Sequence, residues 1–432
     1  MRLRRAIPAA VLATALLLGG CRNVAEIAPP QPPPVSAQDE VAGAGAPEIQ
    51  AAAALWERAP AGTGTITYAE STDQLEAAQE QLLLDFMHFY YGALAGLAVG
   101  DPSEMFAPGA RDQAEISRLL LEAMVEIRAM QNTDLTLTGY AFALDIQAVS
   151  ELETGDLLVR VLEDFTQNFA AFPGVDSKGF GVLHFFTLTQ TSEGWRLVAH
   201  RQADRLYGTV TGRRNTATGR ADLSVDEVRS RREVWLAGAR DAAQSRAAQG
   251  SLPDPLPHYD NPYDRTAAAD YARRWATAAR SPDWAVYDRL GGNCQNFVSQ
   301  AIFAGGIPMD YTAPAQWKWF GDTPNPSFTA SGRAPAWTGV NEFLSYAQNN
   351  AGFGMVALAD APFYSGELGD VIHLGVHGEW RHTVLITQTV ADARGNTVDY
   401  LIASNTANLL DFPVSAYHYQ EQMLIQILGW NG

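Results

Sequence analysis

Apolar residues recur at helical spacing in two stretches of the first half of the chain. Residues 75–97 and 116–130 place an apolar side chain every three or four positions, which predicts two amphipathic helices. Four segments with the patterning of strands follow around two Gly-containing turns: 135–152, 157–169, 182–190 and 195–201. Two helices followed by an antiparallel meander predict a smaller α+β domain over residues 65–206.

Residues 207–260 connect this domain to a second one. They contain a polar loop, a capping-box start at Ser224 for a charged helix that ends near Ala248, and a proline-rich stretch. In residues 261–432, helical and strand patterns alternate again, so this unit is also expected to be α+β. The first domain resembles the cone-shaped cystatin or NTF2-like domains, a fold analogy that carries no function.

The N-terminal segment has the order of a targeting signal. Three arginines within the first five residues precede an apolar stretch from Ala6 to Leu18, and small residues then lead to Cys21. This is the pattern of a bacterial lipoprotein signal peptide over residues 1–21, with Cys21 as the lipidated residue. Residues 22–64, rich in Ala and Pro, predict an extended linker. The body is therefore expected outside the cytoplasm, anchored by lipid to the outer face of the cytoplasmic membrane or to the outer membrane.

Composition narrows the possible partners. The chain has 432 residues, of which 47% are hydrophobic, so it can bury more than one core. The formal net charge of −18 disfavours a nucleic-acid partner, because neutralising phosphates requires a basic face. Only two cysteines are present, which excludes a disulfide-stapled scaffold. With Cys21 lipidated, Cys294 remains a free thiol in an oxidising compartment, and such a thiol invites a functional explanation.

The surroundings of Cys294 favour a nucleophile. Glycines and Asn293 precede the cysteine, and helix-forming residues with an apolar stripe follow it up to Gly305-Gly306. The thiol is therefore expected at a helix N-terminus, where free N–H groups and the helix dipole lower the pKa of a thiol. The alternative is a buried cysteine that only packs the helix, but packing does not call for the flanking glycines.

A thiolate nucleophile needs a base and a group that orients the base. His382 starts a predicted strand and shares a face with Val384 and Ile386, while Asn405 ends the next predicted strand. If the two strands pair antiparallel, the start of one meets the end of the other. The Asn405 carboxamide is then expected to accept a hydrogen bond from the His382 ring and to fix its tautomer.

The region from Tyr263 to Trp430 resembles the "putative amidase domain" of bacterial exported proteins, a relative of the papain-like NlpC/P60 and CHAP cysteine hydrolases. The resemblance rests on the run from Cys294 to Gln300 (Cys-Gln-Asn-Phe-Val-Ser-Gln), on Tyr263-Asp264-Arg265, on Trp337-Thr338-Gly339, on Gly369-Asp370-Val371 and on Trp380-Arg381-His382-Thr383. It implies a papain-like α+β fold with Cys294 as nucleophile and His382 as general base. Two positions depart from the family: Asn293 stands where aspartate is common, and Asn405 where histidine is common.

Two further groups of residues allow more than one interpretation. His373, His377 and His382 with Asp370 could be read as a metal site, but glycines break the segment and strand parity gives the histidines no common face. No metal or cofactor is therefore expected. Three tryptophans are expected mainly in the core, although in a papain-like groove one or two could line the substrate side: Trp317, Trp319 and Trp337.

The sequence thus predicts a cysteine amidase or peptidase that cleaves an amide bond through a thioacyl intermediate. Cys294 attacks, His382 moves the proton, Asn405 orients the ring, and Asn293 is the candidate side-chain donor to the oxyanion. The predicted location and the family resemblance make a peptide of peptidoglycan the expected substrate. One alternative is a wall-binding or scaffolding lipoprotein without turnover, and another places the function in a ligand-binding N-terminal domain. The sequence does not predict an oligomeric state.

Overall fold

The computed structural model describes residues 62–212, 223–277, 279–288 and 292–432, all of which fall within one compact unit. The predicted signal peptide with Cys21 and nearly all of the predicted linker lie outside the described residues. None of the described helices is long and apolar enough to cross a membrane.

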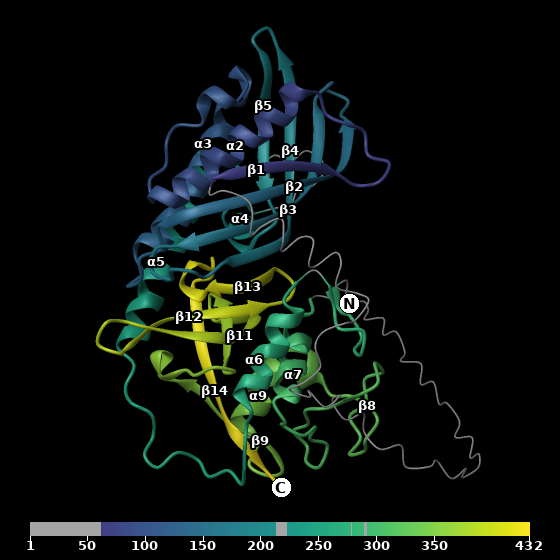
Figure 1. The fold of residues 1–432 in the computed structure, drawn as a ribbon, viewed down its shortest axis with the longest axis vertical. Coiled ribbons are helices and arrows are strands. Elements are labelled where there is room, and N and C mark those ends of the chain that lie inside the picture. Colours follow the sequence, from purple (N-terminus) through teal and green to yellow (C-terminus); the bar gives the residue numbers. More distant parts are fainter. Residues whose placement is uncertain (1–61, 213–222, 278, 289–291) are drawn as a thin grey trace, which may run out of the picture. The chain divides into compact units, whose positions relative to one another are not determined.

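The fold is mixed α+β, built on one large sheet that is antiparallel except for the pair β1 and β2 (Figure 1). The strand order is β1-β2-β3-β4-β13-β12-β11-β10-β14-β6, with β5 on β4 and β9 on β14. The strands are β1 (Thr63–Tyr68), β2 (Leu137–Glu151), β3 (Leu157–Phe169), β4 (Ser177–Thr191), β5 (Gly194–Gln202), β6 (Asn261–Pro262), β9 (Gly354–Ala361), β10 (Val371–Val376), β11 (Glu379–Ala391), β12 (Thr397–Ser404), β13 (Asn408–Pro413) and β14 (Glu421–Asn431). A separate short pair is formed by β7 (Trp319–Phe320) and β8 (Gly332–Arg333).

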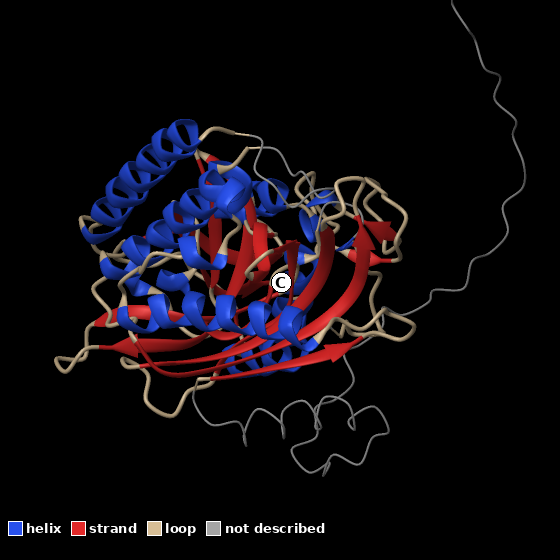
Figure 2. Ribbon diagram, turned by 90° about the horizontal axis from the view of Figure 1, so that it is seen from above, coloured by secondary structure: helices blue, strands red, loops and turns tan. Residues whose placement is uncertain are grey.

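Helices pack along one side of the long curved strands (Figure 2). The α-helices are α2 (Ala77–Gly96), α3 (Arg111–Ala129), α4 (Arg205–Val210), α5 (Val225–Ala247), α6 (Arg265–Trp275), α7 (Cys294–Ala304), α8 (Pro335–Thr338) and α9 (Val340–Asn349). The two helices predicted first correspond to α2 and α3, and the predicted capping box at Ser224 starts α5.

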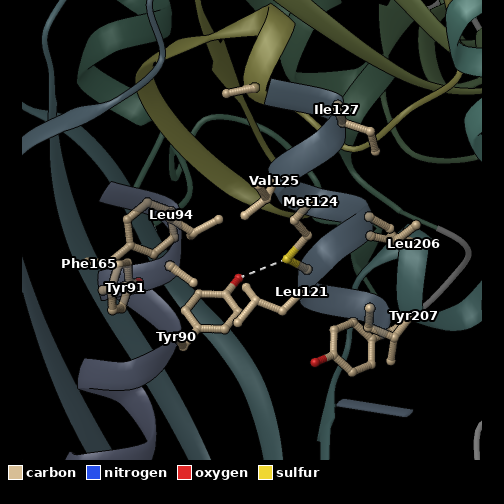
Figure 3. Close-up of a cluster of buried hydrophobic side chains, with 14 of the residues drawn as sticks. Tyr90, Tyr91, Leu94, Leu121, Met124, Val125, Ile127, Phe165, Leu206 and Tyr207 are labelled. Carbon is tan, nitrogen blue, oxygen red and sulfur yellow. Dashed lines mark hydrogen bonds between the residues drawn. The ribbon is translucent and has the colours of Figure 1, made fainter. Parts of the chain in front are cut away.

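The apolar periodicity of the first half produces a dense core between its helices and its strands. Figure 3 shows Tyr90 of α2 next to Met124 of α3, with the phenol donating a 3.3 Å hydrogen bond to the Met124 sulfur. Leu206 and Tyr207 of the short helix α4 insert into the same cluster and are fully buried. Helix α4 is therefore held rigidly by the N-terminal half of the protein.

The two predicted domains share the large sheet. The first residues of β4 pair with β13, and its later residues pair with β5. Gly181 lies where the partner changes; its φ of +69° and the hydrogen bond from its N–H to the Asp164 carboxylate mark a local bend. Ser177 Oγ adds a 2.7 Å bond to the Asp411 carbonyl in β13. Neither side of this junction was predicted from the sequence, because the predicted strand began at Val182 and no strand was predicted over residues 408–413.

In the C-terminal half, α6, α7 and α9 pack on one face of the sheet. Leu385 of β11 and Ala403 of β12 belong to the core cluster that contains the apolar residues of α7. Their neighbours Ile386 and Ile402 point to the opposite face and belong to the cluster shared with the N-terminal half. Alternate residues of β11 and β12 thus face opposite sides of the sheet, and only residues on the same side can contact one another.

Candidate active site

Cys294 is the first residue of α7, as predicted, and its thiol lies at the N-terminus of that helix. The sulfur accepts hydrogen bonds from the backbone N–H groups of Cys294 itself, of Gln295 and of Thr383. The pairing of β12 with β11 begins at Leu385, so the N–H of Thr383 lies beyond the end of β12 and is available to the sulfur. The thiol therefore lies beside the residue that follows His382.

Burial outweighs these donors in setting the pKa of the thiol. Cys294 is only 8% exposed, and loss of solvent raises its pKa above the usual value, while the three N–H groups lower it less. The prediction of a lowered pKa was wrong for this conformation. The helix N-terminus is where the sequence placed it, but the sequence did not show how completely the thiol is covered.

His382 lies near the start of β11 and is 3% exposed. Its Nε2 lies 2.9 Å from Ser404 Oγ, and that hydroxyl donates in turn to the Ala407 carbonyl at 2.7 Å. Since a serine hydroxyl has one proton, Nε2–H donates to Ser404 and Nδ1 keeps the free lone pair. The ring is thus held in one tautomer, with Nδ1 unprotonated and able to accept a proton.

Asn405 does not make the hydrogen bond to His382 that the sequence suggested. Its amide donates to the Trp275 carbonyl of α6 at 2.8 Å, and its Oδ1 accepts from Asn293 at 3.0 Å. The strands do pair antiparallel, but alternation along β12 puts Ser404, not Asn405, on the face of His382. Strand parity, applied to both strands in the sequence, would have selected Ser404.

Asn293 is also occupied within the fold. Its Nδ2 donates to Asn405, and its Oδ1 accepts from the Tyr287 N–H at 3.2 Å and from Asn296 at 2.9 Å. Because the side chain is buried and bonded at both ends, it cannot donate to an oxyanion in this conformation. The carboxamide instead fixes the loop before α7, leaving the backbone N–H groups at the sulfur as the donors near the reacting carbon.

The tryptophans predicted for a substrate groove belong mostly to the core. Trp317 and Trp337 are fully buried, with their indole N–H groups donating to Ser299 and Asn296 of α7. They therefore cannot line a groove. Trp319 is partly buried and donates to the Tyr287 hydroxyl at 3.0 Å, so its indole is also held by the fold.

Two tyrosines that the sequence analysis did not select cover His382. The Tyr419 ring stacks on the imidazole with centroids 5.8 Å apart, and the Tyr417 ring meets it edge-on at 5.6 Å. Both phenols lie close enough to Cys294 for the thiolate to raise their pKa values further, after the larger effect of burial. The thiol and the imidazole therefore share one enclosed environment.

Arg205 of α4 reaches this environment from the N-terminal half. Its guanidinium lies 5.8 Å from the centre of the Tyr419 ring and hydrogen-bonds the phenol. Burial first, and the Arg205 cation second, lower the pKa of His382 to about 3. The imidazole is then neutral at physiological pH, and with this low pKa it is a weak proton acceptor in this conformation. No signal in the sequence relates Arg205 to Cys294 and His382, which follow it by 89 and 177 residues.

A second histidine, His373, lies next to this site on β10. It is fully buried between Phe343 and Trp380, neither ring nitrogen has a hydrogen-bond partner among the described residues, and burial lowers its pKa to about 3. Within the described ranges, no group of three or more His, Cys, Asp or Glu side chains is placed to hold a metal ion.

Replacing Ser404 by alanine is expected to lower kcat for amide hydrolysis by roughly 3- to 10-fold, because the His382 tautomer loses one hydrogen bond. Ser404→Thr keeps the hydroxyl and should retain most of the rate. Steady-state kinetics on the two variants and the parent protein measure this difference. An unchanged kcat in Ser404→Ala would show that the hydroxyl does not orient the ring.

Comparisons with known proteins agree with the resemblance in the C-terminal half. Residues 262–428 match the family described as "Putative amidase domain". A curated relative, "Uncharacterized protein YhbB" of Bacillus subtilis (strain 168), is 32% identical over 139 residues, which is 31% of this chain and 39% of the relative. The chain thus spans well under half the length of that protein. No solved structure matched the chain. The family match indicates a hydrolase that acts on amides.

Proposed function

We propose that this protein is a cysteine hydrolase that cleaves an amide bond through a thioacyl intermediate. The observation that carries the proposal is the Cys294 sulfur at the start of α7, which accepts a hydrogen bond from the N–H of Thr383, the residue after His382. A cysteine beside a neutral, oriented imidazole is the arrangement that nucleophilic acyl transfer needs. We also propose a papain-like fold for residues 261–432.

The chemistry follows from these groups. His382 takes the thiol proton as the Cys294 sulfur attacks the carbonyl carbon, and the oxyanion forms near the N–H groups now bonded to the sulfur. The imidazolium returns its proton to the leaving amine, which breaks the C–N bond and leaves a thioester. Water, deprotonated by His382, then attacks the thioester, and the proton passes back to the sulfur as the acid is released.

The substrate proposal is a peptide of peptidoglycan. It rests on the lipoprotein pattern around Cys21, which would place the body of the protein in the cell envelope, and on the amidase match of residues 262–428. A diacylglycerol on Cys21 together with an N-terminal acyl chain would supply more than the one lipid chain that is too weak for stable anchoring. The strongly acidic composition is in keeping with a partner other than nucleic acid.

The test is digestion of purified peptidoglycan by the full-length protein beside Cys294→Ala, with released fragments identified by mass spectrometry. We expect new fragments from the parent protein only, and their masses identify the bond that is cut. If neither protein releases fragments even after the site has been opened by the substitutions described below, the proposal fails. The wall-binding lipoprotein without turnover, which the burial of both catalytic groups also favours, then becomes the better explanation.

A further inference from the structure

The segment from Tyr417 to Gln420, here called the lid, connects the short 3-10 turn Val414–Ala416 to β14. We propose that the N-terminal half of the protein holds this lid shut over Cys294 and His382, so that the fold described here is an autoinhibited form. The inference concerns the regulation of the proposed active site and therefore rests on the proposed function. It predicts that the thiol becomes accessible when contacts between α4, α5 and the lid are broken.

The first observation is that a substrate cannot reach the catalytic pair as it stands. Attack requires the substrate carbonyl about 3–3.5 Å from the sulfur, but Cys294 and His382 are 8% and 3% exposed. Tyr417 and Tyr419 of the lid contact the imidazole and are themselves partly exposed. The lid is therefore a layer between the catalytic groups and solvent, and it has to move before an amide can bind.

The second observation is that Arg205 of α4 and the residue before it contact the middle of the lid. The Asp204 carboxylate, directly before α4, lies 3.8 Å from His418 Nδ1. The next residue, Arg205, both stacks on and hydrogen-bonds Tyr419. Arg205 has no carboxylate partner within 4 Å in the described part of the chain, so its charge is directed to the lid and to the site beneath it. Two consecutive residues of the N-terminal half thus contact two consecutive residues of the lid.

Helix α5 holds the end of the lid. Gln420 Nε2 donates a 3.0 Å hydrogen bond to the Trp235 carbonyl, and this glutamine is buried. Gly238, one turn further along α5, lets the helix approach closely: a Cβ at this position would lie 2.5 Å from Gln420 Nε2. A side chain at this position would displace the end of the Gln420 side chain.

These contacts come from rigid elements. Tyr207 and Leu206 anchor α4 in the core of the N-terminal half (Figure 3), and Asp204 caps the helix by accepting the Tyr207 N–H at 2.7 Å. Trp235 is almost completely buried in the same cluster. The lid has only its own four residues between two anchored ends. Opening by displacement of the lid is therefore less costly than disruption of the helices that hold it.

The experiment measures the rate at which iodoacetamide alkylates Cys294 in the full-length protein. A Cys21→Ser background leaves Cys294 as the single thiol. Because labelling of a covered group follows the population of open molecules, Arg205→Ala should accelerate alkylation by roughly 3- to 30-fold, the effect of losing one cation–π contact. Removing the cation also raises the pKa of His382, so an acceleration in Arg205→Ala reports opening only when a variant that changes no charge shows it as well.

A second variant and a matched control complete the design. Gln420→Ala removes the bond to the Trp235 carbonyl without changing any charge and should also accelerate labelling. Arg160→Ala removes an arginine that is exposed on β3 of the same half and should label at the parent rate. Circular dichroism confirms that each variant is folded. Hydrogen exchange of the lid amides in the parent protein should be slow and should become faster in Arg205→Ala.

The outcomes separate the lid from the catalytic proposal. The lid proposal is wrong if folded Arg205→Ala and Gln420→Ala are alkylated at the parent rate. It is also wrong if the lid amides exchange fast in the parent protein. Faster labelling in both variants without any amide hydrolysis supports the proposal that the lid covers the thiol and contradicts the proposed hydrolase function. Faster labelling together with increased hydrolysis by Gln420→Ala supports both.

Discussion

His382→Gln is expected to lower kcat for amide hydrolysis by about 10³- to 10⁴-fold, the loss seen when a nucleophile loses its general base. The glutamine amide can still donate to Ser404 Oγ, which receives the His382 Nε2–H in the parent protein. It cannot accept the thiol proton. The loss therefore isolates proton transfer from the packing of the ring under Tyr419. Steady-state kinetics on the fragment-releasing reaction measure it, with KM expected to change little.

His258→Gln is the matched control for this substitution. This histidine is 85% exposed, lies outside the site and contacts only Asp260 among the described side chains. Its replacement should leave kcat at the parent value. If His382→Gln keeps its rate within tenfold of the parent, the base is a different group, and the buried His373 on the neighbouring strand becomes the residue to substitute next.

The largest expected effect on stability concerns the buried ion pair beneath β10. Asp370 is fully buried and accepts from Arg265 Nη1 at 2.6 Å and from the Ile427 N–H at 2.9 Å. Arg265→Met removes the cation and leaves the carboxylate without its partner, which should lower the free energy of unfolding by about 3–5 kcal/mol. Urea denaturation followed by circular dichroism measures this loss.

The loss should grow with pH. Burial raises the pKa of Asp370 to about 6, above the unfolded value of about 3.9, although Arg265 opposes this shift. A raised acid pKa means that the folded state binds the proton more tightly than the unfolded state does. The stability that the protonated Asp370 contributes is therefore complete below about pH 4 and is lost as the pH rises through the folded pKa. Without Arg265 this pKa rises further. The destabilisation should therefore be larger at pH 8 than at pH 5.

Arg240→Met provides the comparison for an exposed ion pair. Arg240 is 53% exposed and lies 3.1 Å from Glu126, which is 38% exposed. Its replacement should change the free energy of unfolding by about 0–1 kcal/mol, with little dependence on pH. Equal effects of Arg240→Met and Arg265→Met would show that burial does not set the strength of the Arg265–Asp370 pair.

Local patterns gave the elements of this site correctly because each depends on neighbouring residues. Glycines before Cys294 and an apolar stripe after it predicted the helix that begins at Cys294. The alternation around His382 predicted β11, and the antiparallel pairing with β12, which the sequence reasoning had only assumed, is present in the structure. The choice of Asn405 failed at one step, the parity along β12, which puts Ser404 on the face of His382.

By itself, the sequence determined a mixed α+β chain with a thiol at a helix start and an imidazole at a strand start, since the last two follow from spacing within some ten residues. Only the tertiary structure decided how reactive these groups are. The pKa of Cys294 depends on its burial, and the pKa of His382 depends on burial and on the Arg205 charge, which a segment far away in the chain contributes. Solvent exclusion and long-range charge arise from contacts between distant residues, which no local pattern encodes.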